Sequence, residues 1–140
     1  MHRQLSAIAL SVAVSIAVVA CSTPTTSPEA VAAFCKDVKV LQSAVNDMNN
    51  LPPTATKDDI KAAGAKVTDS AQAARNSFQN VKMVDVNDFR NAYDIYTQNL
   101  YEIANYSDPT TFGQKMTAFK VQTAKLKVEV DKVYTGAKCV

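Results

Sequence analysis

The sequence predicts an all-α fold, an antiparallel up-down-up-down four-helix bundle. Three observations support this prediction. Four segments carry apolar residues at steps of three and four, which is the period of an amphipathic helix. The breaks between these segments are short, and short connections favour antiparallel neighbours in a bundle. In that topology Cys35, near the start of the first segment, and Cys139, just after the last, would lie at the same end.

The first predicted helix follows Ser27, a residue type favoured as N-cap. Pro28 then suits the first turn, and Glu29 suits the positive end of the helix dipole. The apolar stripe consists of Val31, Phe34, Cys35, Val38, Leu41, Val45 and Met48. We expect the helix to end within 49–53, Asn-Asn-Leu-Pro-Pro, because proline cannot continue a helix.

The second predicted helix begins after Thr56. Its stripe consists of Ile60, Ala63, Val67, Ala71, Ala74, Phe78 and Val81. Gly64 and the alanines carry little side-chain bulk, so we expect a neighbouring helix to approach closely there. Glycine costs up to about 1 kcal/mol relative to alanine inside a helix, and close packing would explain its use at this position.

Asp85 or Asn87 is expected to cap the third helix, whose stripe consists of Phe89, Ala92, Tyr93, Tyr96, Leu100, Ile103 and Ala104. The segment 107–109, Ser-Asp-Pro, is expected to end that helix and to cap a fourth, with Pro109 early in the new helix. The fourth stripe consists of Phe112, Met116, Phe119, Thr123, Leu126, Val130 and Val133. Gly136 is predicted to supply a left-handed C-cap.

The composition argues against several classes of function. The chain has 140 residues, 47% apolar and 20% charged, and its net charge of +2 lacks the basic excess of a nucleic-acid binder. The one histidine, His2, lies in a segment that we expect to be removed. The mature protein would then lack a histidine for a catalytic relay or an imidazole metal site. The three glycines are too far apart to form a phosphate-binding loop.

The remaining polar patterns have ordinary structural explanations. Acidic pairs stand where helices are predicted to begin, and capping explains them without catalysis. Two of the methionines, Met48 and Met116, fall on core stripes and are expected to fill gaps in the core rather than to bind a metal. We therefore predict no enzyme, no catalytic residue, no metal site and no cofactor.

Two surface features are candidates for recognition. Tyr101 and Tyr106 lie off the predicted apolar stripe, where an exposed aromatic side chain often takes part in binding. The last segment carries Lys115, Lys120, Lys125, Lys127, Lys132 and Lys138. A basic face that includes Lys120 and Lys127 could contact an anionic lipid or wall polymer. The alternatives are an ordinary exposed aromatic and a solvated charged face, balanced by the acids of the third helix.

The N-terminus has the pattern of a signal peptide. A basic start, residues 1–4, precedes an apolar run from Leu5 to Val19. Fifteen helical residues span about 22 Å, less than the roughly 30 Å hydrocarbon layer, and no basic stop-transfer cluster follows. A secretory signal covering residues 1–20 is therefore favoured over a membrane-spanning helix.

The run ends in Val18-Val19-Ala20-Cys21, which resembles the lipobox of bacterial lipoproteins. The resemblance implies that a diacylglyceryl group is attached to the Cys21 thiol and that the chain is cleaved before it. It also implies a location at the extracytoplasmic side of the cell membrane. Leucine is commoner than Val18 in this family, and the alternative is an ordinary signal peptide with an incidental cysteine. The Ala-, Val- and Thr-rich style is similar to small actinobacterial, especially mycobacterial, lipoproteins of unassigned role.

Residues 21–27 would form the lipidated cysteine and a polar, proline-containing tether, and residues 28–140 the helical domain. If lipid occupies Cys21, the remaining cysteines are Cys35 and Cys139, and an exported protein can keep them as a disulfide. The bridge would close a loop of about 100 residues and stabilise the domain by roughly 4–5 kcal/mol. The alternative is a pair of buried free thiols.

We expect a non-enzymatic binding or scaffolding module of the cell envelope. Its partners would be the membrane, through the anchor at Cys21, and an envelope protein or an anionic lipid. The second hypothesis is a carrier that holds a lipid or another apolar ligand inside the bundle. The sequence does not determine the oligomeric state.

Overall fold

A computed structural model describes residues 26–81 and 84–139. Within these ranges the chain forms four α-helices and no strand, so the prediction of an all-α, four-helix fold is confirmed. The helices are α1 (Pro28–Asn49), α2 (Lys57–Phe78), α3 (Asn87–Asn105) and α4 (Phe112–Gly136). None of them is long and apolar enough to cross a membrane.

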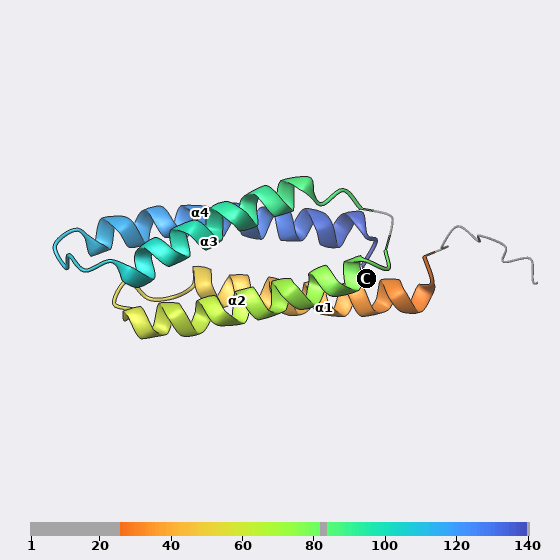
Figure 1. The fold of residues 1–140 in the computed structure, drawn as a ribbon, viewed down its shortest axis with the longest axis horizontal. Coiled ribbons are helices and arrows are strands. Elements are labelled where there is room, and N and C mark those ends of the chain that lie inside the picture. The colour runs from red at the N-terminus through yellow and green to blue at the C-terminus, as the bar shows by residue number, and fades with distance from the viewer. Residues whose placement is uncertain (1–25, 82–83, 140) are drawn as a thin grey trace, which may run out of the picture.

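The helices are arranged as two pairs (Figure 1). α1 packs on α2 in one layer and α3 packs on α4 in the other. Across the layers α1 contacts α4, whereas α2 and α3 make the least extensive contact of the four neighbouring pairs. The first turns of α1 extend past the other helices at the end of the molecule where the C-terminus lies (Figure 1).

The starts of α1 and α2 agree with the sequence prediction. The Ser27 hydroxyl accepts a hydrogen bond from the Ala30 amide at 3.1 Å, which satisfies one free donor of the first turn. Thr56 and Asp59 form a reciprocal capping box: the Asp59 amide donates to Thr56 Oγ1 at 3.2 Å, and the Thr56 amide donates to Asp59 Oδ2 at 2.8 Å.

The start of α3 differs from the prediction. Its N-cap is Val86, which makes no side-chain capping hydrogen bond, and Asn87 is the first helical residue. Asp85 acts one residue earlier, where its carboxylate accepts a hydrogen bond from the Asn87 amide at 2.9 Å.

The start of α4 also corrects the sequence prediction. Pro109 precedes the helix instead of lying in its first turn, because α4 begins at Phe112 after the N-cap Thr111. The Asp108 carboxylate holds the intervening turn by accepting hydrogen bonds from the Thr110 amide at 2.9 Å and from Thr111 Oγ1 at 2.9 Å. The Thr110 hydroxyl also donates to Asp108, and its hydrogen bond, followed by those of the Thr110 amide and the Thr111 hydroxyl, holds the pKa of Asp108 below its usual value. A side-chain-closed turn of this kind competes with the helix for the same backbone.

The predicted left-handed C-cap at Gly136 is wrong. α4 continues through Gly136, and the left-handed residue is Lys138, with φ of 55°. A left-handed conformation costs a non-glycine residue roughly 1–2 kcal/mol. The turn is held by hydrogen bonds from the Lys138 amide to the Thr135 carbonyl and from the Cys139 amide to the Tyr134 carbonyl. It directs Cys139 toward α1.

The predicted apolar stripes form the core, with one correction: Val81 is buried as expected but lies after α2, which ends at Phe78. The largest fully buried side chains come from all four helices: Phe34, Leu41 and Met48 in α1, Ile60 and Val67 in α2, Tyr96 in α3, and Phe119 and Leu126 in α4. Met48 and Met116 are both buried, as predicted from their place on the stripes.

Candidate functional site

A cavity with a volume of about 330 Å³ lies between α2 and α3. Apolar residues from all four helices and from the residue before α3 line it: Phe34, Val38 and Leu41; Ala71, Ala74 and Phe78; Val86, Phe89 and Tyr93; Val130 and Val133. The polar lining residues are Gln72, Arg75, Arg90 and Asp94. The lining therefore joins the middle of α1, the second half of α2, the first half of α3 and the second half of α4.

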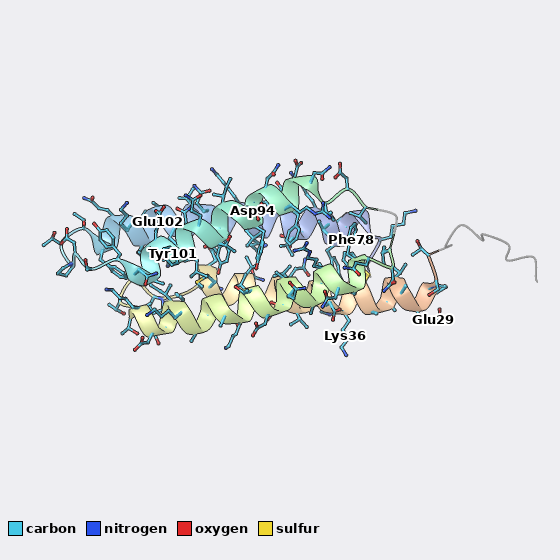
Figure 2. The ribbon with its side chains drawn as sticks, in the orientation of Figure 1. Glu29, Lys36, Phe78, Asp94, Tyr101 and Glu102 are labelled. Carbon is cyan, nitrogen blue, oxygen red and sulfur yellow. A yellow bond between two sulfur atoms is a disulfide. The ribbon has the colours of Figure 1, made fainter. Side chains whose placement is uncertain are left out.

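The lining changes from apolar to charged with increasing exposure. Its floor, made by the α1 residues, the two alanines and the α4 valines, is buried. Its walls include Phe78, Phe89 and Tyr93, which are half-buried, while the four polar residues are exposed. Phe78 lies at the end of α2 between the two helix pairs (Figure 2). The cavity is thus a cleft with an apolar interior and a charged rim.

Small side chains on α2 have two different effects along the α2–α3 contact. At Gly64 they allow close approach, as predicted: an added Cβ would lie 2.7 Å from Leu100 Cδ2. Ala71 and Ala74, nearer the end of α2, line the cavity instead. The small residues therefore explain both the close contact and the cleft.

The charges at the rim are unpaired among the residues that the structure describes. Arg75 in the last turn of α2 and Arg90 in the first turn of α3 both line the cleft, and neither side chain makes an ion pair or hydrogen bond there. Asp94 lies one turn beyond Arg90, and its carboxylate is similarly without a partner in the described ranges.

A row of aromatic rings leads from the cleft into the core. The ring centroids of Phe89 and Tyr93 are 6.0 Å apart, those of Tyr93 and Tyr96 6.3 Å, and those of Tyr96 and Phe119 5.6 Å. The Tyr96 hydroxyl is buried and has no hydrogen-bond partner in the described part of the chain. Burial raises the pKa of the Tyr96 phenol, and the neighbouring Tyr93 adds to the effect.

The two predicted recognition tyrosines differ in their surroundings. Tyr101 on α3 is 73% exposed and points away from the core. Tyr106, just after α3, is half-buried: its hydroxyl hydrogen-bonds to Thr111 Oγ1, and Lys115 Nζ lies 5.7 Å from its ring centroid. Tyr106 therefore supports the α3–α4 connection.

The two predicted recognition lysines contact the protein itself. Lys120 Nζ donates a hydrogen bond to the backbone carbonyl of Leu51, just after α1. Lys127 Nζ lies 2.7 Å from Asp131 Oδ2, and Gln42 of α1 donates to Asp131 Oδ1 at 2.8 Å. Burial of Asp131 would raise its pKa, but these hydrogen bonds and the Lys127 charge outweigh it and lower the pKa. Lys120 thus links α4 to the segment that follows α1, and Lys127 lies beside the hydrogen bond that joins α1 to α4.

The cysteines at the two ends of the domain meet. The sulfur atoms of Cys35 and Cys139 lie 1.99 Å apart, at disulfide distance, with a Cα–Cα separation of 5.4 Å. Cys21 lies outside the described residues. Within the described ranges, no three His, Cys, Asp or Glu side chains gather in a way that could hold a metal ion.

Comparison with known proteins found no matching family model, no matching curated protein and no matching solved structure. The arrangement of the cleft is therefore the basis for the functional argument. Sequence analysis assigned Phe78, Phe89 and Tyr93 to apolar stripes but did not identify the rim. The sequence feature that could have indicated the charged rim is a pair of arginines, Arg75 at the end of one predicted helix and Arg90 at the start of the next.

Proposed function

We propose that this protein is a lipid-anchored, non-enzymatic protein of the extracytoplasmic membrane surface, and that its helical domain binds an apolar or amphipathic ligand. The observation that carries the ligand proposal is the cleft between α2 and α3, whose floor is apolar and buried. Its volume of about 330 Å³ falls at the lower end of the range typical of ligand pockets. Of the two hypotheses from the sequence, this geometry favours the carrier.

The anchoring part of the proposal rests on the sequence. The signal-like run and Val18-Val19-Ala20-Cys21 have the pattern of a lipoprotein precursor. The disulfide distance between Cys35 and Cys139 supports export, because disulfides persist outside the reducing cytoplasm.

The proposal includes the antiparallel up-down-up-down arrangement of the bundle. Three pairs support it by linking α1 and the residues after it to α4 and the residues after it: Cys35 with Cys139, Gln42 with Asp131, and Leu51 with Lys120. As the residue number rises in the first member of each pair, it falls in the second. In this arrangement the cleft lies in the half of the bundle where α1 begins, so an anchor at Cys21 would hold it near the membrane.

Metabolic labelling in the native host tests the anchor. The full chain should incorporate an alkyne-tagged fatty acid and remain in the membrane fraction, whereas Cys21→Ser should do neither. Ser22→Ala, one residue away, is the matched control and should be labelled like the wild type. Equal labelling of Cys21→Ser and the wild type would contradict the anchor.

Photocrosslinking tests the cleft. The full chain, reconstituted in neutral phosphatidylcholine vesicles, is exposed to a diazirine-bearing hexadecanol, and the adducts are mapped by peptide mass spectrometry. Adducts should concentrate on residues that line the cleft. Ala74→Leu, which adds volume inside the cleft, should reduce them, while the exposed Ala62→Leu on the same helix should not. Adducts that avoid the cleft in the folded wild type would reject the ligand proposal.

A scaffolding role is the second candidate, and the exposure of Tyr101 favours it. Its ring is 73% exposed, and Ile95 on the same helix is 48% exposed. Crosslinking of the anchored protein in its host should then capture one specific envelope partner with wild-type protein and lose it with Tyr101→Ala.

A further inference from the structure

The geometry points to a single-chain amphiphile with a carboxylate head group, a long-chain fatty acid, as the ligand of the cleft. This inference rests on the proposed function, since it requires that the cleft holds an apolar chain. It adds the chemistry of the head group and identifies Arg75 and Arg90 as the residues that select it.

The charge at the rim favours an anion. Arg75 and Arg90 approach the cleft from two different helices, while Asp94 is the one acid among the described lining residues. The charged lining thus has two positive groups and one negative group, a net charge of +1. Since neither guanidinium has an ion-pair partner among the described residues, both are available to a ligand.

Arginine suits a carboxylate in particular. Its planar guanidinium presents paired N–H donors that match the two oxygens of a carboxylate. Gln72, beside Arg75 on the rim, uses its amide nitrogen to donate to Asn76 at 2.9 Å. The strongest free donors at the rim are therefore the two arginines.

The size of the cleft favours one chain. An apolar cavity of about 150 Å³ is filled by a benzene-sized ligand. The cleft, at about 330 Å³, is roughly twice that volume, which suits a folded or partly inserted single alkyl chain better than the two chains of a phospholipid. The tail would lie on the buried floor against Phe34, Leu41 and Val130, and the head would remain at the rim.

Head-group competition tests the inference. The full chain in neutral phosphatidylcholine vesicles is labelled with three probes that share one alkyl diazirine: hexadecanoate, hexadecanol and hexadecyltrimethylammonium. The pH is kept where the carboxylate is ionised. We expect about fivefold more cleft adduct with the carboxylate than with the alcohol, as an exposed ion pair allows, and less with the cation than with the alcohol.

Substitutions at the rim show which residues cause the preference for the carboxylate probe. Arg75→Gln combined with Arg90→Gln should lower cleft labelling by the carboxylate more than labelling by the alcohol, so that the preference is lost. Lys66→Gln removes one positive charge from the exposed surface of α2 outside the cleft, and it should keep the preference. Asp94→Asn should increase the preference, because it removes the negative charge at the rim.

The outcomes separate this inference from the proposed function. Equal cleft labelling by all three probes would overturn the carboxylate ligand and leave the apolar cleft standing. If no probe labels the cleft, both proposals fail. Stronger cleft labelling by a two-chain anionic phospholipid probe than by hexadecanoate would overturn the single-chain ligand.

Discussion

Gly64 shows how one missing side chain positions a helix. A Cβ at this position would lie 2.7 Å from Leu100 Cδ2 and 2.8 Å from Leu100 Cδ1, closer than such atoms approach without displacement. Gly113, in contrast, has nothing within 4 Å of an added Cβ. The two glycines therefore form a matched pair, one constrained by packing and one in open space.

We expect Gly64→Ala to lower the free energy of unfolding by about 1 kcal/mol, because the strain of overpacking exceeds the gain in helix propensity. In a Leu100→Ala background the same change should be stabilising, by up to about 1 kcal/mol. Urea denaturation of the wild type, the two single variants and the double variant measures both effects. Gly113→Ala is the control and should not be destabilising; a stabilising Gly64→Ala in the wild type would contradict the packing argument.

Tyr96 carries a polar atom that the core does not satisfy. Its side chain is fully buried, and its hydroxyl has no partner in the described part of the chain. A buried group that loses its hydrogen bonds to water without replacement costs about 1–3 kcal/mol. Packing of the Tyr96 ring stabilises the fold, and the cost of burying its unpartnered hydroxyl cancels part of that stabilisation.

We expect Tyr96→Phe to raise the free energy of unfolding by about 1 kcal/mol. Because burial raises the pKa of the folded Tyr96 phenol above its unfolded value of about 10, the wild type should lose stability as the pH rises above that value. Tyr96→Phe should lose less in the same range. Chemical denaturation as a function of pH measures this, with the exposed Tyr101→Phe as control; a strongly destabilised Tyr96→Phe would show that the hydroxyl is satisfied.

At the scale of the helices, the start of α2 depends on the capping box. Hydrogen bonds from the Thr56 side chain and then from its backbone lower the pKa of Asp59. A lowered folded pKa means that this contribution is present above the unfolded pKa of about 4 and is lost as the pH falls through the folded value.

We expect Thr56→Ala to lower the free energy of unfolding by about 1 kcal/mol near neutral pH. The free energy of unfolding should also fall less steeply as the pH drops below about 4, because Asp59 then lacks the Thr56 hydroxyl as a donor. Thermal unfolding from neutral to acid pH measures both. Thr54→Ala, in the same loop, alters an exposed residue outside the capping box and should change neither; an identical acid slope in Thr56→Ala would contradict this account.

At the scale of the whole molecule, the two ends of the domain are joined. Cys35 and Cys139 are separated by 104 residues in sequence, yet their sulfur atoms lie at disulfide distance. Closing a loop of this length is expected to stabilise a fold by roughly 4–5 kcal/mol in the chain-entropy model. This is a large share of the stability of a small domain.

We expect the double variant Cys35→Ser with Cys139→Ser to lose about 4 kcal/mol of unfolding free energy. Protection from hydrogen exchange should fall first in the early turns of α1 and the last turn of α4, since those segments adjoin the missing bridge. The variant should be insensitive to reductant, whereas the wild type should be destabilised by it. Unchanged stability of the wild type on reduction would show that the bridge contributes little.

Features that depend on residues close together in the sequence were predicted more accurately than features that depend on residues far apart in the sequence. The stripe residues lie on the four helices as predicted, except Val81, which follows the end of α2, and Ser27 and Thr56 cap as expected. These features depend on residues within one turn of each other. Pro109 was predicted in the first turn of the fourth helix, but the Asp108 side chain closes a turn there and α4 begins later. Gly136 was predicted as the left-handed C-cap, but the left-handed residue is Lys138. The surface role expected of Lys120 did not include its hydrogen bond to the Leu51 carbonyl, which is distant in sequence and becomes visible only in three dimensions. Lys127 pairs with Asp131 one turn away on α4, and the contact that the tertiary structure adds there is the hydrogen bond from Gln42 of α1 to Asp131.

Helical periodicity therefore predicted most of the residues that form helices and the face of each helix that is buried, because these properties follow from contacts three or four residues apart. The cleft between α2 and α3, with Arg75 and Arg90 at its rim, depends on the distance between helices that are adjacent in sequence but only loosely packed. That distance is set by side chains from all four helices at once. A cavity is volume that those side chains leave unfilled, and such volume has no signature in any one segment.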